Sequence, residues 1–160
     1  MPATGKGRWF RLNSKTTVED SLKLPLAKFQ KCFDRESSGT ITWSRMDKVH
    51  SSIGYFIKLN FGSPVVTLDY RWRQTETVLL PINLESTPTQ FGGLRWWFTC
   101  PLSVNGVACN RRVGTLYLSP GAKYFGCRHC HKLTYRSCQE AHQMERLFAQ
   151  LGFETRHAVE

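Results

Sequence analysis

The chain has 160 residues, of which 41% are hydrophobic, and its formal net charge at pH 7 is +10. This length fits one domain, or a small domain with an added metal module, and the hydrophobic fraction excludes a wholly disordered protein. No hydrophobic run is long enough to span a membrane, and residues 1–7 lack an apolar signal region, so we expect a cytoplasmic protein without membrane contacts.

The N-terminal half is predicted to begin with two short helices. Residues 1–15 are small, basic and turn-like, and we expect a flexible N-terminus there. From Thr17 a cap residue precedes two acids, which is typical of a helix start. Pro25 interrupts this helix and suits the first position of a second one, from Leu26 to about Phe33. The two helices would cover part of the sheet that follows.

Hydrophobic residues then alternate with polar ones between Thr40 and Thr99. Five segments show this period of two: residues 41–43, 53–59, 66–72, 78–84 and 94–98. Short polar joints separate them, which predicts an antiparallel sheet with one face on a core and one face in water. We therefore expect residues 16–95 to form a body of helices and sheet.

Four cysteines in two pairs follow the last of these strands. Cys127 and Cys130 have the two-residue spacing of a metal knuckle, whereas eight residues separate Cys100 from Cys109. Apolar residues on both sides of a Pro-Gly turn at residues 119–122 predict a hairpin between the pairs. The pattern predicts a zinc ribbon over residues 96–136, with one structural Zn²⁺ on the four thiolates.

Two alternatives to this ligand set remain open. The four cysteines would form two disulfides in an oxidising compartment, but no secretory signal is visible. His129 or His131 would otherwise replace one cysteine as a ligand. Cys32 and Cys138 match no ligand position and are expected to be ordinary thiols.

A C-terminal helix is predicted after the cysteine module. Ser137 opens a capping box, and hydrophobic residues recur at helical spacing up to Leu151, so we expect a helix over 137–153 and a frayed tail over 154–160. The predicted fold class is α+β: an antiparallel β-sheet body with short N-terminal helices, a C-terminal zinc-ribbon hairpin and a C-terminal helix.

The charge is unevenly distributed. No Asp or Glu occurs from Phe91 to Cys138, while that segment holds seven Lys and Arg residues. Since zinc with four thiolates carries about −2, the local charge would be about +5, which favours a polyanionic partner. Aromatic residues interleave with the cations, as expected for contacts with phosphates and unstacked bases. The predicted nucleic-acid-binding residues are Arg71, Arg73, Arg95, Trp97, Arg111, Arg112, Lys123, Arg128, Lys132 and Arg136.

No catalytic grouping is evident in the sequence. There is no nucleophile elbow, phosphate loop or dinucleotide fingerprint, and the acids are scattered. Four cysteines would close the metal site, whereas catalytic zinc needs an open position. We therefore expect a protein that is not an enzyme; the alternative is a nuclease that uses His129, His131 or His142 as a general base.

Three segments carry a resemblance to a known family. Residues 92–101, 109–118 and 127–137 resemble small bacterial proteins found in prophages and other mobile elements, and the match covers most of the chain. The resemblance implies a zinc ribbon on a β-rich body and a mobile-element setting. The family has no assigned activity, and its first knuckle is the tighter Cys-x-x-Cys, from which the spacing of Cys100 and Cys109 departs.

Two functions follow from these observations. The first is a non-enzymatic, zinc-stabilised protein of a phage or mobile element that binds DNA or RNA. The second is a phage or mobile-element protein that binds a host protein, or a nucleoprotein defence complex, and inhibits or redirects it. The predicted helix from Ser137 to Leu151 would supply the docking surface for the second function.

Overall fold

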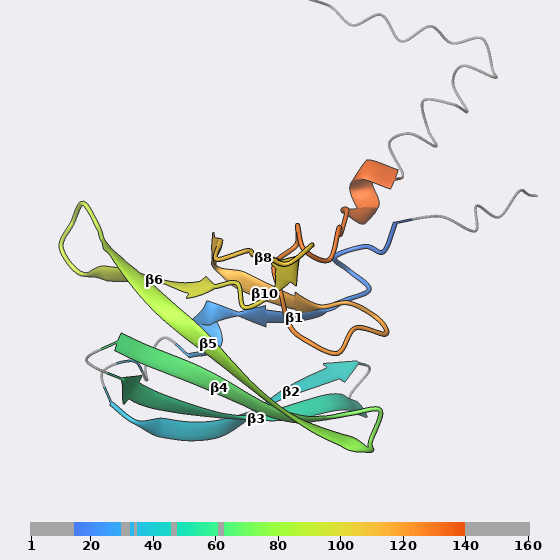
Figure 1. The fold of residues 1–160 in the computed structure, drawn as a ribbon, viewed down its shortest axis with the longest axis horizontal. Coiled ribbons are helices and arrows are strands. Elements are labelled where there is room, and N and C mark those ends of the chain that lie inside the picture. The colour runs from blue at the N-terminus through green and yellow to red at the C-terminus, as the bar shows by residue number, and fades with distance from the viewer. Residues whose placement is uncertain (1–14, 30–32, 34, 46–47, 61–62, 140–160) are drawn as a thin grey trace, which may run out of the picture.

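The computed structural model describes residues 15–29, 33, 35–45, 48–60 and 63–139. Besides a helical turn over residues 136–139, they form one 3-10 turn and ten strands (Figure 1): β1 (Leu22–Pro25), η1 (Leu26–Lys28), β2 (Ser37–Arg45), β3 (Lys48–Asn60), β4 (Ser63–Trp72), β5 (Glu76–Pro88), β6 (Leu94–Thr99), β7 (Ser103–Val104), β8 (Val107–Ala108), β9 (Arg112–Val113) and β10 (Thr115–Leu118).

A curled, six-stranded antiparallel sheet dominates the fold. Its strand order is β2-β3-β4-β5-β6-β9, so neighbours in the sheet are mostly neighbours in the sequence. Strand β5 belongs to both halves: residues 76–83 pair with β4, and residues 84–88 pair with β6. The expected strands over residues 41–43, 53–59, 66–72, 78–84 and 94–98 lie in β2 to β6.

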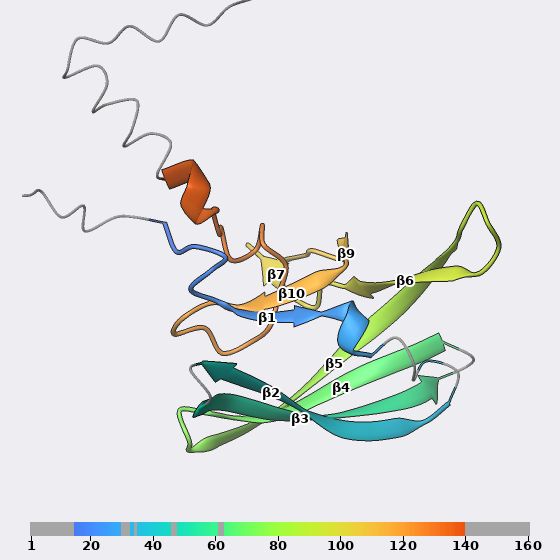
Figure 2. The ribbon, with the colours of Figure 1, turned by 180° about the vertical axis from the view of Figure 1, so that it is seen from behind.

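A second, smaller layer lies across the concave side of this sheet. It consists of β1 paired with β10, and Figures 1 and 2 show it opposite β2, β3 and β4. The core between the layers is apolar, with Phe29, Phe98 and Phe125 fully buried. Phe29 makes edge-to-face contacts with Phe98 and with Tyr55 of β3.

The predicted α+β fold class is wrong, because the protein is mostly β and neither predicted N-terminal helix is formed in the part of the chain that the structure describes. Residues 17–20 make a single turn, and Leu22–Pro25 is the strand β1. This strand buries Leu24 and leaves Lys23 exposed, which is strand periodicity. Its partner strand is β10, about ninety residues further along the chain, and this long-range pairing overrides the local helix signal.

The second predicted helix is reduced to the 3-10 turn η1. Pro25 has an extended backbone, with φ −76° and ψ 142°, and the Phe29 N–H closes the turn on the Leu26 carbonyl at 2.8 Å. The side chains expected to face the core do so, since Leu26, Phe29 and Phe33 are all buried. The core positions were therefore predicted correctly and the backbone conformation was not.

The ends of the chain lie largely outside the described residues. This applies to the flexible segment predicted over 1–15, except residue 15, and to the predicted tail over 154–160. Residues 136–139 form a helical turn at the predicted start of the C-terminal helix, and the rest of that helix, including Glu140 and Leu151, lies outside the described part.

Candidate metal centre and its basic surroundings

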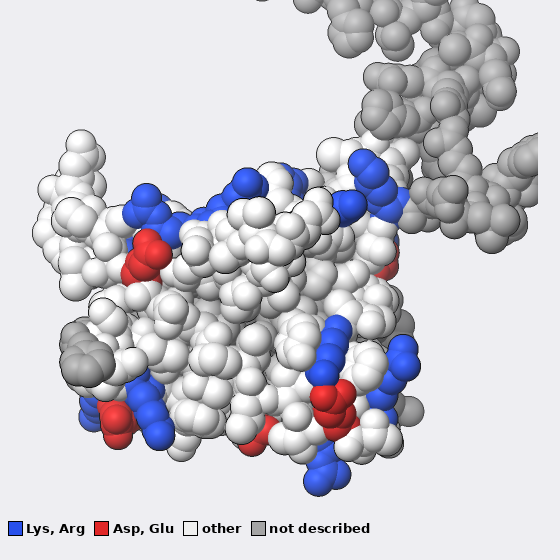
Figure 3. All heavy atoms as spheres, viewed as in Figure 1, with Lys and Arg blue, Asp and Glu red and all other residues white. Residues whose placement is uncertain are grey.

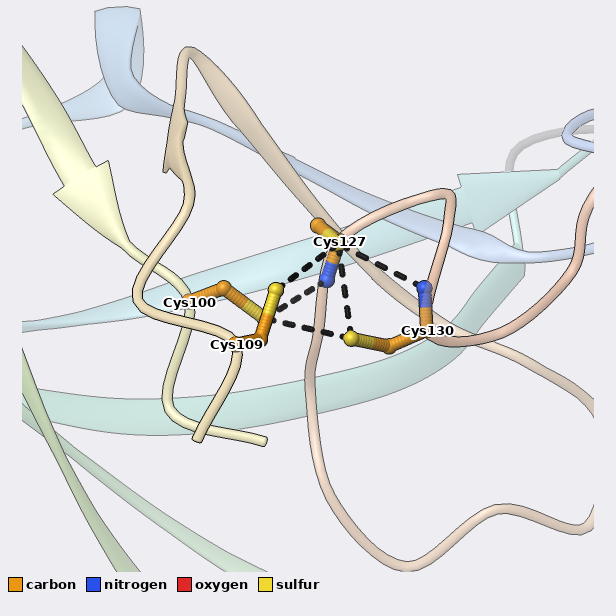
Figure 4. Close-up of side chains that lie close together, drawn as sticks. All are labelled: Cys100, Cys109, Cys127 and Cys130. Carbon is orange, nitrogen blue, oxygen red and sulfur yellow. Dashed lines mark hydrogen bonds between the residues drawn. The ribbon is translucent and has the colours of Figure 1, made fainter. Parts of the chain in front are cut away.

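Two separate turns bring the four cysteines together (Figure 4). Cys100 follows β6 and Cys109 follows β8, whereas Cys127 and Cys130 lie on the turn after Phe125. The Cys100 N–H donates to the Arg111 carbonyl at 3.0 Å, which closes the first turn at its base. The four predicted ligands are thus one cluster, with Cys100 and Cys127 buried.

The spacing of the sulfur atoms fits a tetrahedral ion. All four Sγ atoms lie within 4.8 Å of one another, and Cys127 Sγ is 3.8 Å from Cys109 Sγ and 3.6 Å from Cys130 Sγ. Zn–S bonds of about 2.3 Å place tetrahedral ligands about 3.8 Å apart, whereas a disulfide needs about 2.05 Å. The cluster therefore forms a site that can hold one metal ion and is consistent with zinc.

Backbone N–H groups point at the sulfur atoms. Cys127 N–H donates to Cys100 Sγ at 3.3 Å, and Cys130 N–H donates to Cys127 Sγ at 3.4 Å. Such bonds stabilise thiolate charge and hold ligands in position. The backbone of the second turn therefore favours the deprotonated, metal-binding form of Cys100 and Cys127.

The eight residues between Cys100 and Cys109 form a small hairpin. Strands β7 and β8 pair through Ser103 and Ala108, and the connecting Asn105 and Gly106 have φ values of 52° and 79°. An Asn-Gly pair with two positive φ angles is the favoured two-residue hairpin turn. The Cys109 N–H donates to the Leu102 carbonyl at 2.8 Å, so the insertion still brings the first pair of thiols together.

Leu102 connects the two turns by close packing. A Cβ atom added to Gly126 would lie 2.1 Å from Leu102 Cδ1 and 3.2 Å from His131 Nε2. Gly126 is also bonded to Tyr117 in both directions, at 2.8 and 3.0 Å, so its backbone is fixed. Only a residue without a side chain fits between these groups.

The histidines do not belong to the cluster. His129 is exposed, and among the described residues the group of four thiols includes neither His129 nor His131. Burial lowers the pKa of His131, whose Nε2 has no hydrogen-bond partner. Cys138 is exposed and also lies outside the cluster, while Cys32 is not among the described residues.

The thiol pKa values differ with environment. Burial raises the pKa of Cys100 and of Cys130. Burial also acts on Cys109, but hydrogen bonds from the Arg111 backbone and the neighbouring thiols outweigh it and lower the pKa of that thiol. A metal ion must therefore displace protons from the buried thiols.

Aromatic residues of the sheet fasten this module to the body. Tyr70 Oη donates to the Lys123 carbonyl at 2.7 Å, and Trp72 Nε1 donates to the Ala122 carbonyl at 3.2 Å. Both bonds hold the turn over residues 119–123. Tyr70 and Trp72 are thus structural, although they lie in the aromatic-basic run around Arg71 and Arg73.

Carboxylates from other segments neutralise part of the basic stretch. Arg112 pairs with Glu85 at 3.6 Å, Lys123 pairs with Glu76, and Arg136 pairs with Asp20 at 3.2 Å. Three of the seven cations are therefore paired, which lowers the expected local surplus from about +5 to about +2.

The cations that remain fall into two groups along one side of the molecule. Arg111, Arg128 and Lys132 come from the two cysteine turns, and Arg95 lies on β6. Within the described ranges no carboxylate is in ion-pair distance of these four. Figure 3 shows Lys and Arg side chains along the edge where Figure 1 places β6, β8 and β10.

Trp97 is less free than its strand position implies. Its indole N–H donates to Thr87 Oγ1 at 3.0 Å, and the Arg95 guanidinium lies over its ring at 4.2 Å from the centroid. Trp97 does point away from Phe98, which is buried, as strand alternation predicts. The Trp97 ring and the Arg95 guanidinium therefore stack on each other on the outer side of β6.

The remaining predicted residues lie elsewhere. Arg71 is exposed on β4, and Arg73 lies over the Trp72 ring at 4.3 Å from the centroid. Lys123 approaches the same ring at 5.8 Å. The fold thus places both Arg73 and Lys123 against the Trp72 ring at the end of β4, where the turn over residues 119–123 meets the sheet.

Several residues that shape this region were not predicted. The neutralising carboxylates Glu76 and Glu85 follow from the strand register, which the sequence does not reveal. Tyr135 is 41% exposed with the Arg128 guanidinium 5.0 Å from its ring centroid. Its place in the run from Lys132 to Arg136 was the available signal.

Comparison of the chain with protein-family models, curated proteins and solved structures found no match. Within the residues that the structure describes, no helix has the length and hydropathy needed to cross a membrane.

Proposed function

We propose that the protein is a non-enzymatic nucleic-acid-binding protein stabilised by one structural zinc ion. Four thiolates would occupy all four tetrahedral positions, leaving none for water or substrate, and this favours a structural role for the metal. The ion would hold the turn that carries Cys100 and Cys109 against the turn that carries Cys127 and Cys130.

The observation that carries the proposal is the set of cations around this cluster. Arg128 lies between two ligands, Lys132 follows Cys130 by two residues, and the Arg111 carbonyl accepts a hydrogen bond from Cys100. Because no described carboxylate pairs with these three side chains, phosphates are suitable partners. Tyr135, half-exposed beside Arg128, offers a ring face to a base.

The resemblance to bacterial mobile-element proteins favours a phage or mobile-element role. The surface chemistry fits DNA or RNA, since cations bind backbone phosphates and exposed aromatic rings can stack on any base. The expected location is the cytoplasm, where the protein would encounter DNA or RNA.

Fluorescence anisotropy with labelled single- and double-stranded DNA and RNA tests the proposal. Affinity should fall linearly with the logarithm of salt concentration. Replacing Arg111, Arg128 and Lys132 with Glu should abolish binding at moderate salt and leave the zinc content unchanged.

A matched control carries the same charge change on the body. Lys28, Arg35 and Lys58 are exposed and lie outside the cysteine module, so their replacement with Glu should weaken binding far less. Equal losses in both variants would show a nonspecific charge effect. No binding by the unmodified protein at low salt would refute the proposal.

A protein partner is the second candidate function. It is favoured by the β7–β8 hairpin, where Val104 and Val107 are 43% and 71% exposed next to the metal cluster. A host protein that binds this hairpin should lose affinity when both valines become Ser, with nuclease treatment making no difference.

A further inference from the structure

A long hairpin projects beyond the body of the protein. Its stem is the pairing of residues 85–88 of β5 with residues 94–97 of β6, and Figures 1 and 2 show it extending past the sheet. Leu84 and Phe98, at its base, are buried in the core. We call residues 85–97 the β5–β6 finger.

The tip of the finger is a fixed turn. Thr89 Oγ1 donates to the Gly92 carbonyl at 2.9 Å, and Thr89 N–H donates to the Gly93 carbonyl at 3.1 Å. Gly92 N–H donates a hydrogen bond to the Thr89 carbonyl at 3.2 Å. Gly92 and Gly93 have φ values of 77° and 101°, which residues with side chains rarely adopt, so the glycines hold the turn in place.

This turn presents a bare aromatic ring. Phe91 is 99% exposed, and Leu94, the first stem residue after the tip, is 60% exposed. Burying a Phe side chain is favourable, and the free protein does not gain that stabilisation here. A hydrophobic side chain held on a stiff support is suited to insertion into a partner.

The chemistry around Phe91 favours a nucleic acid as that partner. From Ser86 through Cys138 the chain has no acid, and Glu85, at the finger's base, is paired with Arg112. Arg95 lies on the stem, stacked on Trp97, and apart from Glu85, Phe91 and Leu94 the other exposed stem and tip residues are Ser, Thr, Pro, Gln and Gly. A two-stranded ribbon fits a duplex groove, and Phe and Leu are residues that unstack base steps.

We propose that the β5–β6 finger lies in a groove of a nucleic-acid duplex and inserts Phe91 between two adjacent base pairs. The inference rests on the proposed function and names how that surface engages its ligand. Arg95 contacts a phosphate beside the groove, and Leu94 packs against the unstacked base. The inserted ring unstacks one base step and bends the duplex.

Duplexes that carry 2-aminopurine at successive positions test this insertion, because 2-aminopurine fluoresces when unstacked. Binding of the unmodified protein should raise the emission at one base step and leave the other positions unchanged. Phe91→Ala should abolish the rise and weaken binding about 5- to 100-fold, whereas Phe91→Trp should retain both. Leu79→Ala is the matched control, since Leu79 is also 60% exposed but lies on β5 within the sheet.

The outcomes separate the two proposals. Binding with no rise in emission, or with the same rise in Phe91→Ala, overturns the insertion and leaves the proposed function standing. A rise only with single strands also overturns it. No binding to any nucleic acid by a protein that holds its zinc refutes both proposals, and Phe91 would then be an anchor for a protein pocket.

Discussion

The contact between Leu102 and Gly126 predicts a strong effect of one methyl group. In Gly126→Ala the new Cβ would lie 2.1 Å from Leu102 Cδ1 and 2.7 Å from Leu102 Cγ, well inside contact distance. The backbone cannot yield easily, because Gly126 is bonded to Tyr117 in both directions. Leu102 must move instead, and Cys109 N–H is bonded to its carbonyl, so the movement reaches a ligand.

The magnitude follows from the cost of overpacking. Extra methyl groups in a tightly packed site cost about 1–3 kcal/mol. If that cost falls on the metal-bound state, the affinity for zinc should fall about 5- to 150-fold. Competition with a chromophoric chelator measures it directly. Denaturant unfolding can be followed by tryptophan fluorescence. With zinc bound, the Gly126→Ala variant should unfold at a lower denaturant midpoint than the unmodified protein.

Two variants control this experiment. Gly114→Ala adds the same methyl group where no heavy atom lies within 4 Å of the new Cβ, and it should be close to neutral. Leu102→Ala combined with Gly126→Ala removes the atoms that clash, so the double variant should recover much of the lost affinity. If Gly126→Ala binds zinc as tightly as Gly114→Ala, the close packing described here does not support the metal site.

Three further predictions concern the metal, the module's attachment and its charge. Chelation should lower the denaturation midpoint of the protein and of Cys138→Ser, but not that of Cys127→Ser, which already lacks a ligand; equal sensitivity would place the metal elsewhere. Tyr70→Phe should cost about 1–2 kcal/mol in urea unfolding, because the Lys123 carbonyl loses its donor. Burial raises the pKa of Tyr70, so the stability that its neutral hydroxyl contributes is fully present below about pH 10 and falls progressively as the pH rises from there toward the folded-state pKa, and Tyr70→Phe should flatten this alkaline decline. Glu85→Gln frees Arg112 and should tighten nucleic-acid binding a few-fold, with a salt dependence steeper by about one phosphate contact, whereas an unchanged slope in anisotropy would mean that Arg112 takes no part.

Local patterns in the sequence predicted the sheet strands and the four thiols. Alternation along β4 identified Val66, Leu68 and Tyr70 as core residues, and all three are buried. Strand periodicity is a property of neighbouring residues, so it can be read from one sequence. The cysteine spacing is equally local within the second pair.

Long-range pairing could not be predicted in the same way. Leu22–Pro25 followed a good helix start, yet it became a strand because β10 offered it backbone partners. The charge surplus was overestimated for the same reason, since Glu85 and Asp20 reach Arg112 and Arg136 only in the folded chain. The exposure of Phe91 likewise depends on how far the β5–β6 finger projects.

The pairing of β1 with β10 has a consequence for synthesis of the chain. Leu22 pairs with Leu118, so β1, the first strand of the described residues, waits for β10, the last of them. At about 5–20 residues per second, a ribosome needs roughly 5–20 seconds to make the intervening stretch. During that time the nascent chain carries an unpaired strand edge and the apolar side chain of Leu24, which chaperones recognise. Pairing with β10 would end the interval in which the nascent chain is prone to aggregate, and Cys127 and Cys130, which follow β10, would then complete the candidate metal site.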